Sequence, residues 1–188
     1  MQERAWLQPL SPDSMQQSID IDEVFTTIFD TYYKRIFNYI AYRISCRYMA
    51  EDLTSLVFEK TLSKLSSYSR EKAPFEVWLF AIARNVVNDY YRSRKRNRFF
   101  SLDALRELVS GKKAPEELLL EEERSGRLHH ALDTLGTKER NIVALKFGAG
   151  LKNKEIALLT GMTESNVGVI LYRSMRKLKS EIGSVDEL

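Results

Sequence analysis

Apolar side chains recur every three or four residues along most of the chain, which is the spacing of one helix face. The first stripe predicts a helix over about 22–45, formed by Val24, Phe25, Ile28, Phe29, Tyr32, Ile36, Phe37, Ile40 and Ile44. A second helix is predicted over about 49–65, with Leu53, Val57, Leu62 and Leu65 facing inward. A third begins at Pro74, because proline suits the first turn of a helix, and buries Phe75, Trp78, Leu79, Ile82, Ala83 and Val86.

The pattern breaks over residues 99–125, which contain Gly111, Pro115 and an acidic tract with only short apolar patches. We interpret this segment as a flexible linker with some helical turns, reaching roughly 25–30 Å if fully flexible. Residues 1–20 read as a loose polar N-terminal extension. The predicted fold class is therefore all-α, with two small helical domains at 21–98 and 126–188 joined by the linker.

The second domain shows four short helical segments from Gly126 onward, separated by glycines that can end a helix. These glycines are Gly136, Gly148 and Gly161. Polar residues that can cap the following helices stand after each break, namely Thr137, Asn153 and Thr163. The last helix places Val167, Leu171, Ser174 and Leu178 on one face.

Residues 153–172 have the spacing of a helix-turn-helix. Ala157 is small where two helices would approach, and Gly161 can adopt positive φ in the turn. Val167 would lock the second helix onto the first, with Ile156 and Ile170 filling the core. The second helix then exposes polar and basic side chains that can reach base edges in a DNA major groove. An ordinary helical hairpin with a solvated face is the alternative.

Charge is distributed unevenly although the net charge is only +3. Positive charge is concentrated over 92–98 and 173–179, and negative charge over 116–123, which suits a polyanion on some faces and a basic partner on others. The single cysteine, Cys46, excludes an internal disulfide and fits a reducing, cytoplasmic location. The longest apolar run, 77–83, is too short to span a bilayer, and no membrane insertion is expected.

Three segments carry a family resemblance. The sequence AEDLTSLVFEK at 50–60 resembles region 2.2 of bacterial RNA polymerase sigma factors, and PFEVWLFAIARNVVNDYYR at 74–92 resembles their regions 2.3 and 2.4. Residues 135–178 resemble region 4. The size, without an evident region 1.1 or region 3, is similar to the extracytoplasmic-function (ECF) group. The resemblance covers about 21–179.

The resemblance implies a soluble transcription factor that binds RNA polymerase core, through its β′ and β subunits, and directs it to promoter DNA. No enzymatic activity and no cofactor are implied, and an anti-sigma factor is an expected partner. The second helix would contact the β′ subunit, with acidic and apolar candidates Glu51, Asp52, Leu53, Leu56 and Glu59. A solvated acidic face with Leu53 in the core is an equally good interpretation of these residues taken alone.

The resemblance also places the −10 promoter element on the loop 68–75 and the helix that follows. A flipped base would sit in a pocket at Tyr68, Ile82 and Asn85, where an aromatic ring can stack and an amide can read the base edge. Phosphate contacts are expected from Arg84, Asn88, Arg92, Arg94 and Arg96. Phe75 and Trp78 lie on the buried stripe and are interpreted as core.

The −35 element would be read by the last helix. Tyr172 and Arg173 are the leading candidates, followed by Arg176, Ser165 and Asn166. Gly168 departs from the family pattern, because a basic residue often stands there, and Gly136 stands where many members have proline. The −35 sequence preference therefore does not follow by analogy.

Three other classes of function compete with this interpretation. A helix-turn-helix repressor or activator that acts without polymerase would need a dimer face or a ligand pocket, and the sequence shows neither. An enzyme would need a catalytic or metal cluster, whereas the adjacent His129 and His130 point to different helix faces and make a poor metal pair. A pure interaction module, related to sigma factors but inactive, is supported by Gly168 alone.

Overall fold

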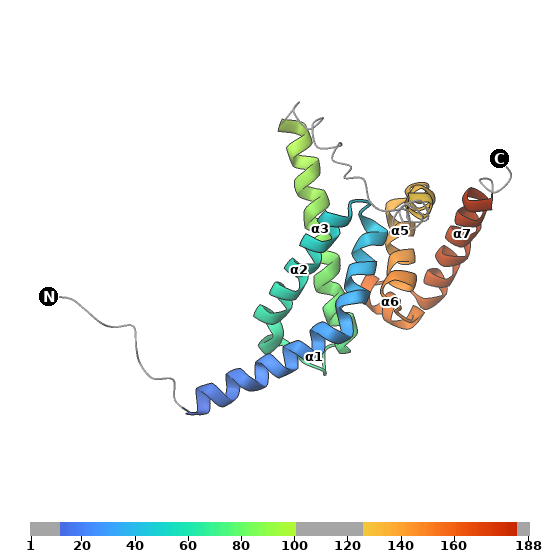
Figure 1. The fold of residues 1–188 in the computed structure, drawn as a ribbon. Coiled ribbons are helices and arrows are strands. Elements are labelled where there is room, and N and C mark those ends of the chain that lie inside the picture. Colours follow the sequence, from blue (N-terminus) through green and yellow to red (C-terminus); the bar gives the residue numbers. More distant parts are fainter. Residues whose placement is uncertain (1–11, 101–125, 184–188) are drawn as a thin grey trace. The chain divides into compact units, whose positions relative to one another are not determined.

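Every element in the described part of the chain, residues 12–100 and 126–183 of this computed structural model, is a helix or a connection between helices (Figure 1). The prediction of an all-α fold with two helical domains is confirmed. The elements are α1 Pro12–Arg43, α2 Arg47–Lys64, the 3-10 helix η1 Leu65–Ser67, α3 Phe75–Phe100, a helical segment over 126–133, α5 Thr137–Val143, the π-helix η2 Ala144–Gly148, α6 Asn153–Thr160 and α7 Glu164–Gly183. None of the described helices is both long and apolar enough to cross a membrane.

The chain separates into two compact units, residues 1–34 and residues 35–188, and each is described by itself. In the first unit, α1 begins at Pro12, so the predicted loose extension at 1–20 is in part helical. No glycine or further proline follows Pro12 before α1 ends, and proline is favoured in the first turn. Ile28 is buried, but Val24 and Phe29, predicted to face inward, are exposed. Phe29 instead stacks with Tyr33 one turn later, at a centroid distance of 5.0 Å.

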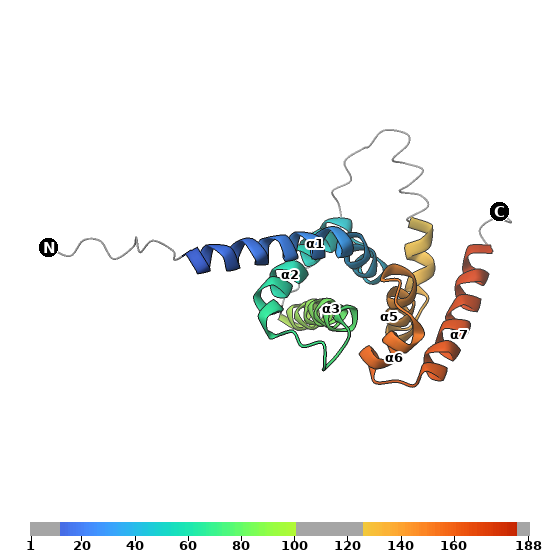
Figure 2. The same cartoon turned by 90° about the horizontal axis from the view of Figure 1, so that it is seen from below.

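The second unit contains the end of α1, α2 and α3, which pack around a shared core. Figure 2 looks along α3 and shows α2 beside it. The largest fully buried side chains of these helices are Ile36, Tyr39, Ile40, Val57, Leu79, Phe80 and Val87.

Helix α2 shows one departure from the predicted inward face. Leu62 is exposed, and Thr54 and Thr61 are fully buried. Each threonine hydroxyl donates to the backbone carbonyl four residues earlier, at 2.7 Å. Because its own helix satisfies the hydroxyl, threonine can occupy a core position that the apolar pattern assigned to leucine.

The C-terminal domain is built from the helical segment over 126–133, α5, η2, α6 and α7. Its core contains Leu132, Ile142, Leu145, Leu151, Ile156 and Val167, all essentially inaccessible to solvent.

Two predicted caps of the C-terminal helices are shifted by one residue. Gly136 rather than Thr137 precedes α5, and Lys152 rather than Asn153 precedes α6. In both cases a glutamate in the first turn accepts a hydrogen bond from the backbone N–H of the N-cap residue, which is the glutamate half of a capping box. The predicted cap at Thr163 is confirmed, because its hydroxyl accepts from Asn166 N at 3.2 Å.

Most of the predicted linker lies outside the described residues, including the acidic tract and the apolar patches at Leu102, Leu105 and 118–120. The part that is described shows α3 continuing to Phe100, past the predicted domain boundary at 98. The side chains of 97–100 and the residues after 183 are likewise not described.

Candidate nucleic-acid and partner interfaces

The turn between α6 and α7 has the geometry expected for a helix-turn-helix. Gly161 ends α6 with φ of 70°, a left-handed conformation that costs glycine nothing. Met162 N donates to Ala157 O at 3.1 Å across the turn. Val167 is fully buried and holds α7 against α6, as the spacing predicted.

Helix α7 has a buried face and an exposed face. Val167, Leu171, Ser174 and Leu178 are buried, as predicted. All five predicted −35 contacts are exposed, namely Ser165, Asn166, Tyr172, Arg173 and Arg176, and Tyr172 is 66% exposed although its ring is large. An exposed helix face with polar and basic side chains and an uncovered aromatic ring is typical of a surface that binds nucleic acid. A face that only meets solvent would rarely carry such a ring.

Gly168 lies beside this exposed face. Its surroundings show whether packing or backbone conformation requires glycine at this position. A Cβ atom at Gly168 would meet nothing within 4 Å, and the backbone has no positive φ there. Neither packing nor conformation therefore requires glycine. Its effect is to leave the helix surface beside Ser165 and Tyr172 without one side chain.

An ion pair holds α7 to α5. Lys177 Nζ contacts Glu139 Oε2 at 2.8 Å, and the same carboxylate accepts from Gly136 N. The hydrogen bond from Lys177 and the one from Gly136 lower the pKa of Glu139. The pair links α7 to α5 one turn beyond Arg173.

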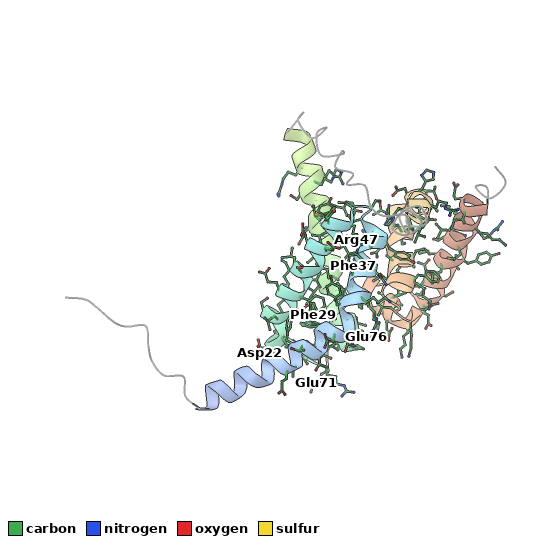
Figure 3. The ribbon with its side chains drawn as sticks, viewed as in Figure 1. Asp22, Phe29, Phe37, Arg47, Glu71 and Glu76 are labelled. Atoms are coloured by element: carbon green, nitrogen blue, oxygen red, sulfur yellow. The ribbon has the colours of Figure 1, made fainter. Side chains whose placement is uncertain are left out.

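The predicted polymerase-binding residues divide between the surface of α2 and the core. Asp52 and Glu59 are exposed, and Glu51 pairs with Arg47 one turn earlier at 3.1 Å. Figure 3 labels Arg47, the first residue of α2. Leu56 is half-buried, but Leu53 is only 8% exposed. Of the predicted residues, three carboxylates and the half-buried Leu56 are therefore accessible on α2, and we assign Leu53 to the core.

The predicted −10 pocket begins in an aromatic cluster. The Tyr68 ring lies 5.2 Å from Phe75 and 5.1 Å from Trp78, measured between centroids, and its hydroxyl donates to Ala73 O at 3.2 Å. Tyr68, Phe75 and Trp78 are all half-buried, so the cluster keeps an accessible edge.

The two other pocket residues, both on α3, differ in exposure. Asn85 is exposed and free to face a base, whereas Ile82 is 7% exposed and serves the core.

The predicted phosphate contacts follow α3 toward its C-terminus. Arg92, Arg94 and Arg96 are exposed, with Arg92 near Asp89 at 3.3 Å. Asn88, Arg92 and Arg94 line a cleft of about 720 Å³. The remaining lining comes from α1, from α3 and from the start of the C-terminal domain, and consists of Arg43, Tyr91, Lys95, Leu135, Thr137 and Arg140.

Arg84, which was predicted to contact phosphate, makes a hydrogen bond within the protein. Its Nη1 donates to Leu159 O in the helix-turn-helix at 2.7 Å.

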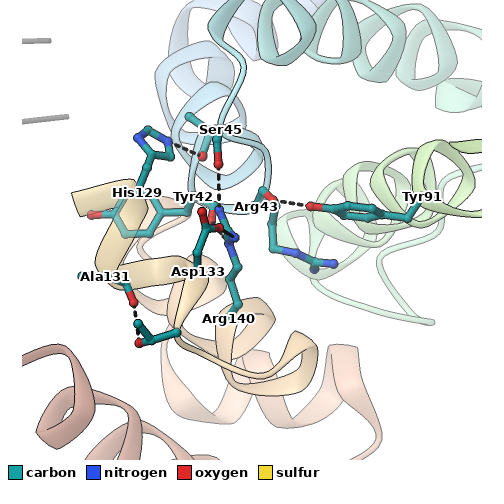
Figure 4. A network of polar contacts seen from close by, with 10 residues as sticks. Tyr42, Arg43, Ser45, Tyr91, His129, Ala131, Asp133 and Arg140 are labelled. Carbon is teal, nitrogen blue, oxygen red and sulfur yellow. Dashed lines mark hydrogen bonds and ion pairs between the residues drawn. The ribbon is translucent and has the colours of Figure 1, made fainter. Parts of the chain in front are cut away.

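The end of α1 makes polar contacts with the C-terminal domain. The sequence analysis did not predict these contacts. Arg140 Nε donates to Tyr42 O at 2.7 Å and pairs with Asp133, while His129 Nε2 lies 3.0 Å from Ala41 O (Figure 4). Tyr91 donates to Arg43 O on the first-domain side of the same network. The sequence signal that could have pointed to these contacts was the presence of polar residues within the apolar stripes.

Tyr39 and Arg43 are the buried members of these contacts. Both donate to Asn141 Oδ1, Tyr39 at 3.1 Å, and they are 0% and 3% exposed. Burial raises the pKa of Tyr39 to about 12, against the opposing effect of Arg43 and Arg84. The phenol therefore stays neutral and acts as a hydrogen-bond donor.

An apolar groove of about 620 Å³ marks the C-terminal domain and was also missed by the sequence analysis. It is lined by Tyr42, Leu128, Leu132, Val143, Phe147, Met175, Leu178, Lys179 and Ile182. Phe147, Met175 and Ile182 are each more than 40% exposed. Exposed apolar side chains gathered around a groove are a feature typical of interaction surfaces.

Two family models match the chain in the regions just described. Residues 28–97 match Sigma-70 region 2, and residues 125–178 match Sigma-70, region 4. The first match contains α2 and most of α3, and the second contains the helix-turn-helix.

Curated relatives carry the same assignment. The chain is 29% identical over 156 residues to the ECF RNA polymerase sigma factor BldN of Streptomyces coelicolor, covering 83% of this chain and 59% of the relative. It is 32% identical over 133 residues to the ECF RNA polymerase sigma factor SigD of Mycobacterium tuberculosis, covering 71% and 63%. The chain thus spans less than two thirds of the length of these two relatives.

Solved structures share the fold. The sigma factor RpoE from Bartonella quintana, in complex with the anti-sigma factor NepR, aligns with a TM-score of 0.68 at 20% identity, covering 86% of this chain and 98% of the other. CnrH, in complex with the cytosolic domain of CnrY, aligns with a TM-score of 0.63 at 19% identity, covering 87% and 90%. Taken with the two family models and the curated relatives, this places the chain in the bacterial RNA polymerase sigma factor family, in its ECF group, with regions 2 and 4.

Proposed function

We propose that this protein binds RNA polymerase core, directs it to promoters by recognising −10 and −35 elements, and assists DNA melting. The exposed face of α7 carries the proposal, because Tyr172, Arg173 and Arg176 are presented on a helix-turn-helix with a well-packed opposite face. The proposed domains are 21–98 for core and −10 binding and 126–188 for −35 binding. The protein would act by binding alone, in the cytoplasm, without catalysis.

In the −35 interaction, α7 would lie in the major groove, which is wide enough for one helix. Arg173 and Arg176 offer bidentate donors to guanine or charge to phosphate, and Ser165 and Asn166 stand near the N-terminus of the helix, where recognition helices meet base edges. Tyr172 adds an apolar surface for a thymine methyl group or a sugar.

In the −10 interaction, the aromatic cluster at Tyr68 and the exposed amide of Asn85 would hold an unstacked base. Stacking on an aromatic ring contributes about 1–3 kcal/mol per base. Arg92, Arg94 and Arg96 would neutralise the phosphates of the separated strand. A base held in this way opposes re-annealing and so favours the melted state.

Core polymerase would be held at two surfaces. The acidic face of α2, with Asp52, Glu59 and the accessible Leu56, suits a basic and partly apolar surface of the β′ subunit. The apolar groove of the C-terminal domain suits an amphipathic segment of the β subunit, since such grooves accept a helix through its apolar face. We also propose an anti-sigma factor as a partner, by analogy with the complexes of RpoE with NepR and of CnrH with CnrY.

A promoter selection with purified core tests the proposal. Core polymerase is incubated with a library of genomic DNA fragments, with and without this protein, and bound fragments are sequenced. Recovery of fragments sharing two motifs about 25 base pairs apart, only when the protein is present, is the expected result. Recovery of the same fragments by the protein without polymerase would instead favour an ordinary helix-turn-helix regulator.

A further inference from the structure

The cleft beside the C-terminal half of α3 is lined mainly by positive charge. Five of its nine lining residues are cations, namely Arg43, Arg92, Arg94, Lys95 and Arg140. No carboxylate of the described residues lines it. Its volume of about 720 Å³ lies within the range of small-molecule sites. The cleft therefore has the size for a small ligand and the charge for an anion.

Two of the five cations already have a carboxylate partner. Arg140 pairs with Asp133, and Arg92 lies 3.3 Å from Asp89. The other three pair with no carboxylate in the described part of the chain, and they are Arg43, Arg94 and Lys95. Three positive charges in the cleft are therefore not balanced by these residues.

Arg43 stands out among the three because it is buried, with 3% of the residue exposed. Its guanidinium donates to the neutral Asn141 Oδ1 and lies 5.7 Å from the centroid of the Tyr91 ring. Tyr91 in turn donates to Arg43 O (Figure 4). These neutral groups, together with the C-terminus of α1, offset part of the cost of burying a charge. None of them carries a full negative charge, which a bound anion would supply.

The kind and number of cations favour a ligand with more than one phosphate. The planar donors of arginine match the oxygens of a phosphate, and two of the three unbalanced residues are arginines. A terminal phosphate carries a charge of about −1.5 to −2 at pH 7, so three positive charges correspond to about two phosphates. A single carboxylate would leave the cleft strongly positive.

Tyr91 and Asn88 add the features that recognise a base. Both line the same cleft, one turn apart on α3, and Tyr91 is 37% exposed although Arg43 lies over its ring. An aromatic ring can stack on a base, and an amide offers a donor and an acceptor to its edge. We propose that this cleft binds a nucleoside di- or triphosphate. Its phosphates lie against the three unbalanced cations, and its base lies against Tyr91 and Asn88.

The nucleotide site overlaps the proposed −10 surface. Asn88, Arg92 and Arg94 line the cleft and also belong to the predicted contacts with promoter phosphates. A nucleotide in the cleft would therefore compete with the −10 strand for these side chains. This consequence rests on the proposed function, whereas nucleotide binding by the free chain does not.

Isothermal titration of the full chain, without polymerase or DNA, tests the site. The three probes are ATP, inorganic tripolyphosphate and adenosine. ATP should bind saturably, and adenosine, which lacks phosphates, should not bind detectably. Tripolyphosphate should bind about tenfold more weakly than ATP, because it lacks the base that stacks on Tyr91.

Two pairs of variants locate the binding. Lys95→Glu changes an exposed residue outside the proposed promoter contacts and should weaken ATP binding by about tenfold or more. Lys64→Glu is the matched control, because Lys64 is an exposed lysine at the end of α2 that does not line the cleft. Tyr91→Leu should abolish the preference for ATP over tripolyphosphate, and Tyr91→Phe should keep it because the ring remains. Circular dichroism confirms that each variant is folded.

The outcomes separate this site from general attraction to a basic chain. Absence of saturable ATP binding, or an equal loss of affinity in Lys95→Glu and Lys64→Glu, would overturn the site. Equal affinities for ATP and tripolyphosphate would overturn the assignment to a nucleotide. If ATP binds as expected but the chain does not bind core polymerase, the nucleotide site exists and the proposed function has failed.

Discussion

Replacing Arg173 gives the sharpest test of the recognition helix, because the structure separates binding from folding at that position. Arg173 is exposed on α7, where surface substitutions change the free energy of unfolding by no more than about 0.5 kcal/mol. If its guanidinium makes a bidentate contact with a base, Arg173→Ala should weaken promoter binding by about 1–3 kcal/mol, and only on the matched sequence. If it contacts a phosphate, binding should weaken on all sequences and the salt slope should fall by about one.

Arg173→Lys distinguishes these cases further. Lysine keeps the charge but lacks the planar pair of donors, so it should rescue a phosphate contact and fail to rescue a bidentate base contact. The assay is a titration of the polymerase complex on matched and scrambled −35 sites at several salt concentrations. Val167→Ala is the contrasting variant, because Val167 is fully buried and its truncation should destabilise the domain by about 2 kcal/mol. If the double change Tyr172→Ala, Arg173→Ala alters neither affinity nor salt slope in a folded protein, α7 is not the DNA reader.

Three further predictions concern the surface of α2, the predicted −10 pocket and the buried Tyr39. Asp52→Arg combined with Leu56→Arg should abolish association with core polymerase while the C-terminal domain stays folded. The reason is that the two changes reverse a charge and remove an apolar contact on the surface of α2. Unchanged affinity in a titration with core polymerase would reject this surface as the binding site. Alanine at Tyr68 or Asn85 should reduce open-complex formation and relax selectivity at one −10 base, as measured by permanganate footprinting; an undiminished bubble with both replaced would reject the pocket. The raised pKa of Tyr39, about 12 against the ordinary 10, means that the folded form retains its proton where the unfolded chain has lost it. Stability from this group is therefore complete below pH 10 and declines as pH rises toward 12, and Tyr39→Phe should remove that part of the slope in urea titrations; an identical slope in both proteins would contradict the assignment.

Local sequence chemistry was sufficient to predict the helix-turn-helix. Ala157, Gly161 and Val167 act within about ten residues of one another, and each is chosen by sterics that depend only on the two helices concerned. The exposed face of α7 followed from the same periodicity. The family resemblance then predicted partner surfaces on α2 and α3, which remain predictions.

The contacts between the end of α1 and the C-terminal domain were beyond sequence reasoning, because the residues that make them lie 98 and 102 positions apart in the sequence. Gly148 was interpreted as the end of a helix, the usual local role of glycine, whereas its main constraint comes from the backbone at Tyr39. The resemblance predicted that Arg84 contacts phosphate, and nothing in the sequence pointed to the hydrogen bond that Arg84 donates to Leu159 O in α6. Thr61 rather than Leu62 faces the core. Burial of the Thr61 hydroxyl costs little free energy, because the hydroxyl donates a hydrogen bond to Val57 O of its own helix.

Run-off transcription with purified core polymerase tests the central claim most directly. Templates recovered by the promoter selection are transcribed with core alone, with core plus this protein, and with core plus the Tyr172→Ala, Arg173→Ala double variant. The account predicts transcripts with defined start sites that require the protein and are weakened by the double variant. Transcription from these templates that is the same with core alone as with core plus the protein would contradict it.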